Sequence, residues 1–266
     1  MNYQQYKPPQ ILSGIVQHYW SLHGNIPADQ TYIHRTLANF CPELIFHYGG
    51  TFRELTARDK NEKTFISGIH GQTDQIRRFT ATKGYGIFGV ILQPYAIPIL
   101  FGVSSTDVKN ELVDLESLLK QDGKDLTDKI MLAKDNTERL QLINRFLVNR
   151  LKQAERQDVI YATHQIYNLK GIVNVNDLAD SCSLSQRQFE RKFKEHIGFS
   201  AKSFARLVRF KSLISSYKKG DSTLTRVAYD FGYYDQAHFI QDFKQFAGYS
   251  PHAYFSGKAK EVFYAP

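Results

Sequence analysis

Residues 189–204 read FERKFKEHIGFSAKSF, and residues 239–254 read FIQDFKQFAGYSPHAY, so one pattern occurs twice at an offset of 50 residues. Both copies keep Phe-x3-Phe-Lys, then Gly, an aromatic residue and Ser, and a final aromatic residue. Each copy follows a short segment with a small residue, Leu-Ala at 178–179 and Val-Ala at 227–228. A short helix, a turn and a second helix with a basic outer face can present a rod to a DNA groove. The repeat therefore predicts two helix-turn-helix units.

The basic charge is concentrated in the same part of the chain. The whole sequence of 266 residues has a formal net charge of +8. Residues 165–266 hold 15 Lys and Arg against 9 Asp and Glu, a net charge of +6. Such an excess is expected of a domain that meets a polyanion, although a merely basic domain is the alternative.

Composition excludes several classes of protein. The chain is 42% hydrophobic and 14% aromatic, which is typical of a globular protein of two domains. No run approaches the ~18 apolar residues of a membrane span, and the N-terminus lacks the apolar core of a signal peptide. Two cysteines, Cys41 and Cys182, are too few for a disulfide scaffold. We therefore expect a cytoplasmic, nucleoid-associated protein with no membrane partner.

The N-terminal part predicts short strands rich in aromatic and β-branched residues. The expected strands cover 14–22, 31–37, 43–48, 64–69, 76–82 and 85–93. This spacing favours an α+β fold whose first domain is mostly antiparallel, as a barrel or a sandwich, with flanking helices.

After Pro94 the apolar spacing becomes helical. Helices are expected at 95–101, 106–120, 136–152 and 158–169. A polar stretch at 153–158 marks the boundary between an N-terminal regulatory domain, 1–153, and a C-terminal DNA-binding domain, 158–258.

The C-terminal domain is predicted to be all α, with its two units joined by a linker helix. Its expected helices are 176–182, 186–197, 204–218, 223–231, 236–247 and a short one opened by Pro251. Asn176, Ser185 and Asp235 are the predicted N-caps.

In the first unit, helical spacing places Phe189, Phe193 and Ile197 on one buried stripe. The DNA-contacting side then carries Gln186, Arg187, Glu190, Arg191 and Lys194. Arg187 and Arg191 lie one turn apart, so both can reach guanine O6 and N7 in a major groove. The alternative is a solvated basic face on an ordinary bundle helix.

In the second unit, Phe239 and Phe243 are predicted to point inward. The outer face carries Gln236, Ala237, His238, Gln241 and Lys244. Ala237 suits a thymine methyl group and Gln241 suits adenine. Lys244 and its equivalent Lys194 come late in their helices, where contacts to phosphate are expected.

Three segments carry a resemblance to a known family. They read LADSCSLSQRQFERKFKEHIGFSAKSF (178–204), RLVRFKSL (206–213) and RVAYDFGYYDQAHFIQDFKQFAGYSPHAYF (226–255). They resemble the paired helix-turn-helix module of AraC/XylS-type bacterial transcription regulators. The resemblance implies that both recognition helices enter successive major-groove segments about one helical turn (~34 Å) apart.

The same resemblance implies a sequence-specific transcription regulator, and an activator rather than a repressor. Its implied partners are double-stranded promoter DNA and RNA polymerase, with a small-molecule effector and a homodimer as further options. A cofactor is not expected. The alternative is an architectural or constitutive DNA-binding protein that has no effector.

The first domain resembles, at residues 40–50 and 89–104, a sensor-like domain that precedes such modules. Trp20, Glu43 and His47 are the candidate ligand-binding residues, since Glu43 and His47 share one face of a strand. A satisfied polar pair is the alternative. Histidines at 18, 23, 34, 47 and 70 lack metal-ligand spacing, so no metal site is predicted.

Enzymatic signatures are missing from the sequence. It has no G-x-S-x-G, no P-loop and no dinucleotide-binding fingerprint. No catalytic residues are therefore assigned.

Overall fold

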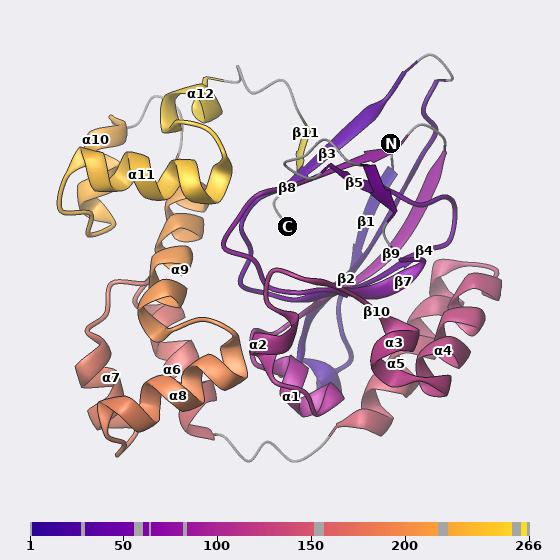
Figure 1. Cartoon of the computed structure of the whole chain (residues 1–266), viewed down its shortest axis with the longest axis horizontal. Coiled ribbons are helices and arrows are strands. Elements are labelled where there is room, and N and C mark those ends of the chain that lie inside the picture. The colour runs from indigo at the N-terminus through magenta and orange to yellow at the C-terminus, as the bar shows by residue number, and fades with distance from the viewer. Residues whose placement is uncertain are drawn as a thin grey trace.

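The computed structural model describes residues 2–27, 30–55, 61–63, 65–81, 84–151, 157–217, 223–256 and 262–264. Figure 1 shows an N-terminal half built on β-sheets and a C-terminal half built from the helices between residues 157 and 255. The boundary expected at 153–158 falls largely on residues 152–156, which lie outside the described residues. None of the described helices is long and apolar enough to cross a bilayer.

The described strands form two sheets rather than a closed barrel, as the sandwich alternative predicted. The first sheet is antiparallel, in the order β1 (Asn2–Tyr6), β2 (Val16–Gly24), β9 (Tyr85–Leu92), β4 (Glu43–His47), β7 (Ser67–His70) and β10 (Leu112–Asp114). The second has the order β11 (Val262–Tyr264), β3 (Tyr32–Thr36), β8 (Arg77–Ala81), β5 (Arg53–Leu55) and β6 (Asn61–Lys63). β11 pairs parallel with β3, so the end of the chain returns to the N-terminal domain.

Apolar residues of both sheets meet between them. Leu22, Ile45 and Ile87 of the first sheet share a buried cluster with Phe79 of the second. Strand β9 is buried along its whole length. Its glycine at 89 leaves room for an indole, since a Cβ there would lie 2.2 Å from Cε2 of Trp20. Trp20 can therefore pack closely on the backbone of β9.

Helices cover the other face of the first sheet. The short helix η1 (Gln10–Leu12) precedes β2, and the helices that follow β9 are α1 (Ala96–Phe101), α2 (Ser105–Val108), α3 (Leu115–Leu119), α4 (Gln121–Leu132) and α5 (Asn136–Arg150). The hydroxyl of Tyr19 in β2 donates to Oδ1 of Asn144 in α5 at 2.5 Å, which fixes α5 to the sheet.

The prediction of a single helix at 106–120 is wrong. The structure divides it into α2, strand β10 and α3, because Asn110 has a φ of 61° and residues 112–114 pair with β7. Asp114 then caps α3 by accepting from the backbone N–H of Ser117 at 2.8 Å. Helix α4 was not predicted, and Lys120, at a φ of 55°, separates it from α3.

The C-terminal half contains α6 (Gln157–Asn168), α7 (Val175–Ser181), α8 (Gln186–Ile197), α9 (Ala201–Ser216), α10 (Leu224–Asp230), α11 (Gln236–Ala247) and α12 (Pro251–Phe255). Ser185 and Asp235 cap α8 and α11 as predicted. The cap of α7 is Asn174 and not Asn176, because the helix begins at Val175, two residues before a helix capped by Asn176 would begin.

The phenylalanines of the repeat form the core of this half, as the helical spacing predicts. Phe193 of α8 packs edge-on against Phe204 of α9, with ring centroids 5.6 Å apart. Phe243 of α11 packs against Phe210, which also belongs to α9, with ring centroids 5.2 Å apart. One linker helix thus supplies the partner ring for both units.

Replacing Phe243 with Ala should destabilise the protein by ~3–5 kcal/mol, because the ring is fully buried and its loss leaves a cavity. Chemical denaturation of the full chain measures this. Gln241→Ala is the matched control, because Gln241 is an exposed residue of the same helix. It should leave the free energy of unfolding within about 0.5 kcal/mol of wild type. Equal free energies of unfolding for the two variants would contradict the packing described.

Candidate nucleic-acid interface and inter-sheet cavity

The first candidate recognition helix is α8. Ser185 and Gln188 form a capping box at its start, which satisfies backbone N–H groups that the helix itself leaves unpaired. The buried stripe of Phe189, Phe193 and Ile197 faces the core. The opposite side exposes Gln186, Arg187, Arg191 and Lys194.

Glu190 differs from the other predicted contact residues of α8. It is half-buried, and its Oε2 accepts from the backbone N–H of Ala201, the first residue of α9, at 3.4 Å. A carboxylate at a helix N-terminus is electrostatically favourable. The structure therefore gives Glu190 a contact inside the protein.

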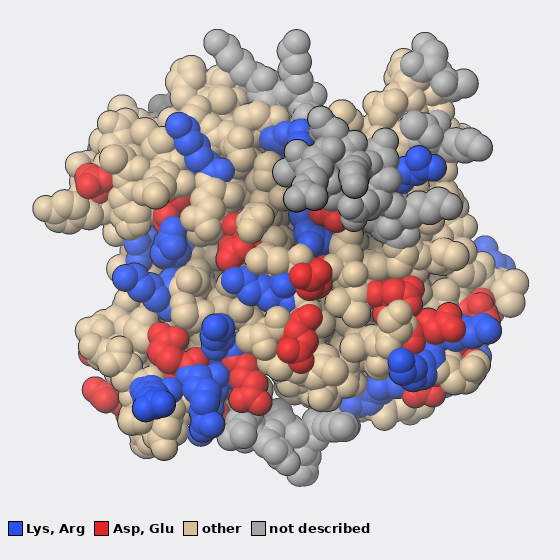
Figure 2. All heavy atoms as spheres, in the orientation of Figure 1, with Lys and Arg blue, Asp and Glu red and all other residues tan. Residues whose placement is uncertain are grey.

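The second candidate recognition helix is α11. It exposes Gln236, Ala237, Gln241 and Lys244, all on the side away from the buried phenylalanines. His238 is half-buried, with its ring edge-on to Tyr233 at 5.4 Å and its Nε2 3.8 Å from Asp242. Figure 2 shows Lys and Arg side chains over α8 and α9, with acidic side chains among them.

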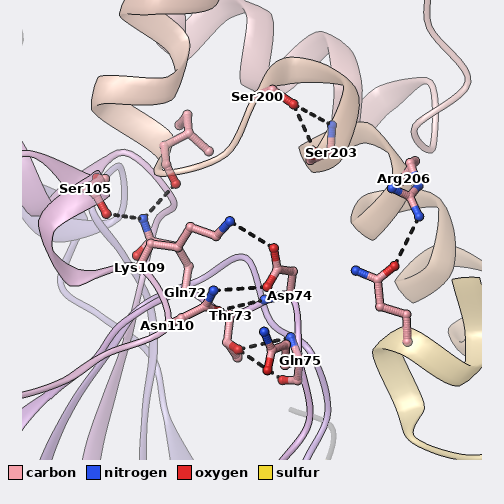
Figure 3. A network of polar contacts seen from close by, with 12 residues as sticks. Gln72, Thr73, Asp74, Gln75, Ser105, Lys109, Asn110, Ser200, Ser203 and Arg206 are labelled. Carbon is pink, nitrogen blue, oxygen red and sulfur yellow. Dashed lines mark hydrogen bonds and ion pairs between the residues drawn. The ribbon is translucent and has the colours of Figure 1, made fainter.

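Asp242 lies on the buried side of α11 and is 1% exposed. Arg206 of α9 donates to both of its oxygens, from Nη2 at 2.5 Å and from Nε at 3.3 Å. Arg206 also reaches Gln245 at 3.3 Å, the contact drawn in Figure 3. This pair was not predicted from the sequence. Asp242 comes three residues after Phe239, so helical spacing places this acidic residue on the apolar side of α11.

The N-terminal domain contacts the C-terminal end of α8. Ser104 Oγ donates to the carbonyl of Glu195 at 3.0 Å, and Ser105 Oγ donates to that of His196 at 2.5 Å. The last carbonyl groups of a helix have no partner within the helix, so the two serine hydroxyls satisfy carbonyls that α8 leaves unpaired.

Gln72 continues this set of contacts, as Figure 3 shows. Its Nε2 donates to the carbonyl of Ile197 at 2.7 Å and to that of Ser105 at 3.2 Å. The next residue, Gly198, has a φ of 81°, and a Cβ there would lie 2.3 Å from Nε2 of Gln72. Glycine therefore allows both the turn and the close approach of the two domains.

The end of α11 also lies against the N-terminal domain. The carbonyl of Phe246 accepts from the backbone N–H of Ala38 at 3.0 Å. The guanidinium of Arg35 lies 4.3 Å from the ring centroid of Tyr249. Both candidate recognition helices therefore end on the same domain.

A third link joins the linker helix to the N-terminal domain. Nζ of Lys211 in α9 donates to Oδ1 of Asn39 at 2.7 Å, and Nδ2 of Asn39 donates to Glu43 at 3.3 Å. Burial raises the pKa of Glu43 to about 7, against the opposing effect of Lys211. Burial also lowers the pKa of Lys211.

The predicted ligand-binding residues Trp20, Glu43 and His47 all line one cavity between the sheets, with a volume of about 70 Å³. His34 and His70 line it as well, from β3 and β7. Sequence reasoning treated these two as scattered residues, because nothing in the spacing shows that the two sheets bring them together. A second cavity of about 50 Å³ shares Glu43 and His70 with the first and is also lined by Lys211.

The imidazoles of the first cavity are neutral. Burial lowers the pKa of His34 and His47 to about 4, and that of His70 well below its ordinary value. Among the described residues, no group of three or more His, Cys, Asp and Glu side chains has an arrangement that could hold a metal ion.

Two family models match the chain. Residues 178–257 match a helix-turn-helix domain, and residues 4–114 match a domain of unknown function (DUF6597). An uncharacterized HTH-type transcriptional regulator of Haemophilus influenzae is 32% identical over 81 residues, or 30% of this chain. The match spans 27% of that relative's length.

Two solved structures align with this chain. The 1.65 Å structure of ToxT from Vibrio cholerae has a TM-score of 0.47 and 13% identity, covering 90% of this chain and 98% of that chain. The C-terminal domain of AraT, a response regulator from Geobacillus stearothermophilus, has a TM-score of 0.35 and 19% identity. It covers 40% of this chain and 88% of that domain.

The free energy of unfolding should fall as the pH falls from about 6.5 towards 4. His34, His47 and His70 bind protons in the unfolded chain that they do not bind when folded. Glu43 acts in the opposite direction, because its folded pKa of about 7 lies above the ordinary 4.5 and its proton stabilises the folded state.

Chemical denaturation between pH 5 and 7 measures this slope. His47→Gln should make it shallower, and Glu43→Gln should make it steeper. A shallower slope for Glu43→Gln would show that the carboxyl does not retain its proton.

Proposed function

We propose that this chain, whose residues 178–257 are a helix-turn-helix domain of the AraC type, is a sequence-specific DNA-binding transcription regulator. The observation that carries the proposal is the pair of capped helices α8 and α11. Both bury their phenylalanines and expose a polar face, which carries arginine, glutamine and lysine in α8 and glutamine, alanine and lysine in α11. Figure 1 shows them at opposite ends of α9.

Helix α8 supplies most of the base recognition in this proposal. Arg187 and Arg191 are exposed one turn apart, and neither has a described ion-pair partner. A guanidinium can donate two hydrogen bonds to guanine O6 and N7. Lys194 comes one turn nearer the C-terminus, where a phosphate contact is favoured.

Helix α11 has a less charged outer face and sets register more than sequence choice. Ala237 suits a thymine methyl group, and Gln241 suits the N6 and N7 atoms of adenine. Lys244 occupies the repeat position of Lys194 and takes the same phosphate role. His238 contributes little to base recognition, because its ring packs on Tyr233.

The N-terminal domain modulates DNA binding in this proposal. It contacts the ends of α8 and α11 and holds Lys211 of α9, so a change in the domain would reach both recognition helices. A small-molecule effector would act through a difference in affinity between two states, typically ~1–3 kcal/mol. Activation through RNA polymerase and dimerisation belong to the same proposal. The cavity favours this function over an architectural DNA binder without an effector.

Arg191→Ala should weaken binding to the operator by about 1–3 kcal/mol and relax preference at one base pair. The operator is first obtained by selecting bound fragments from the host genome. Affinity is then measured on that sequence, on single-base variants and on random DNA. Arg226→Ala, an exposed arginine of α10, is the matched control and should leave base preference unchanged. An equal loss on specific and random DNA would refute the assigned role of Arg191.

Lys194→Ala should weaken binding to all sequences similarly and reduce the slope of log affinity against log salt by about one unit. The reason is that the lysine releases counterions from phosphate without reading a base. A salt titration of the variant and wild type tests this. An unchanged slope would place Lys194 away from the DNA backbone.

A further inference from the structure

The first cavity has mainly apolar walls. Leu22, Ile45, Phe79 and Ile87 line it together with the ring of Trp20. Its volume of about 70 Å³ exceeds the ~10–15 Å³ that holds one water molecule. A space of this kind favours an organic group over a cluster of water molecules.

Its polar groups gather from three strands and carry little charge. His47 and Glu43 come from β4, His34 from β3 and His70 from β7. The three imidazoles are neutral at pH 7, since burial lowers the pKa of each. The pKa of Glu43, about 7, leaves its carboxyl partly protonated under the same conditions.

One of these groups lacks a partner. Nε2 of His70 is buried and has no hydrogen-bond partner among the described residues. The ring is held in place by stacking on Phe79, with centroids 5.3 Å apart and planes 13° apart. His47, by contrast, already bonds the carbonyl of Phe65 at 3.1 Å. A buried polar atom without a partner is costly, so a ligand that supplies one is favoured.

The nearby cations lie outside this cavity. Lys211 and Arg77 line the second cavity and not the first. An anion placed in the first cavity would lose its hydration without meeting a cation that lines the same cavity, which is strongly unfavourable. A cation would meet only Glu43, whose carboxyl is partly protonated.

We propose that the first cavity binds a small, uncharged and largely apolar organic molecule with one hydroxyl or similar group, which pairs with His70 Nε2 and Glu43. This inference rests on the proposed function, because it assigns the chemical class of the effector. Glu43 is also the end of the chain of contacts through Asn39 to Lys211 of the linker helix. A ligand that bonds Glu43 would therefore act on a residue that is linked through Asn39 to the linker helix.

Phenol is a suitable probe for the full-length protein at pH 7, because it has one ring and one hydroxyl group. Titration calorimetry should compare phenol with three probes. Toluene has no polar group, benzoate has a negative charge and benzylammonium has a positive charge. Phenol is expected to bind about tenfold more tightly than either charged probe. Tighter binding of benzoate would overturn the proposal in favour of an anion site near Lys211, and tighter binding of benzylammonium would do so in favour of a cation at an ionised Glu43. No binding of phenol would also overturn it.

His70→Leu separates a ligand contact from a structural role. The variant should lose about tenfold in affinity for phenol and keep its affinity for toluene, because leucine keeps an apolar wall but cannot form the hydrogen bond. His23→Leu, an exposed histidine outside the cavity, is the matched control and should change neither affinity. An equal loss for both probes in His70→Leu would show that the imidazole only shapes the cavity and would refute its assigned role.

DNA binding measured on the same preparations keeps the two proposals apart. If phenol fails to bind while genomic selection still yields an operator, the effector class is wrong and the regulator stands. If DNA binding fails while phenol binds as expected, the proposed function fails and the cavity remains a ligand site.

Discussion

The ends of the two candidate recognition helices, α8 and α11, need hydrogen-bond donors that the helices cannot supply themselves. The last carbonyls of any α-helix are unpaired within it. In α8, three successive carbonyls are met by Ser104, Ser105 and Gln72, and in α11 the carbonyl of Phe246 is met by Ala38. All four donors belong to one domain. The N-terminal domain is therefore part of what orients both helices, and the linker helix α9 is not the sole connection between them.

One position of the repeat forms an ion pair in both candidate recognition helices, with a basic residue in α8 and an acidic residue in α11. Lys192 of α8 pairs with Asp158 of α6 at 3.1 Å, and the equivalent residue of α11, Asp242, pairs with Arg206. The phenylalanine stripe is shared by both units, while these ion pairs differ in sign and in partner. Duplicated units can thus keep one core and still pack on different neighbours.

Features with a regular period could be predicted from the sequence. The stripes of α8 and α11 follow the helical repeat, and the strands of the first domain follow runs of aromatic and β-branched residues. The same reasoning failed at 106–120, where apolar positions fit a helix but Asn110 and pairing with β7 break it. Strands β1, β5, β6 and β11 were missed because they are short or polar, and because their pairing is a tertiary property.

The candidate sites show the same division. Trp20, Glu43 and His47 could be grouped because two of them share one face of a strand. His34 and His70 join them only through the packing of two sheets, which no local pattern encodes. The contacts of Gln72 with α8 and of Lys211 with Asn39 join residues more than 100 positions apart, so they too lay beyond sequence reasoning.

Gly198 and Gly248 have a consequence for the modularity of this protein. Each adopts a positive φ, and each leaves a space that a side chain of the N-terminal domain fills, Gln72 for the first and Ile76 for the second. A chimera that joined residues 157–256 to an unrelated sensor would keep both turns, but the two spaces would be empty. Three carbonyl groups of α8 would also lose their donors and face solvent. The DNA-binding half is thus fitted to its own N-terminal domain, and exchange between regulators would require the receiving surface to change with it.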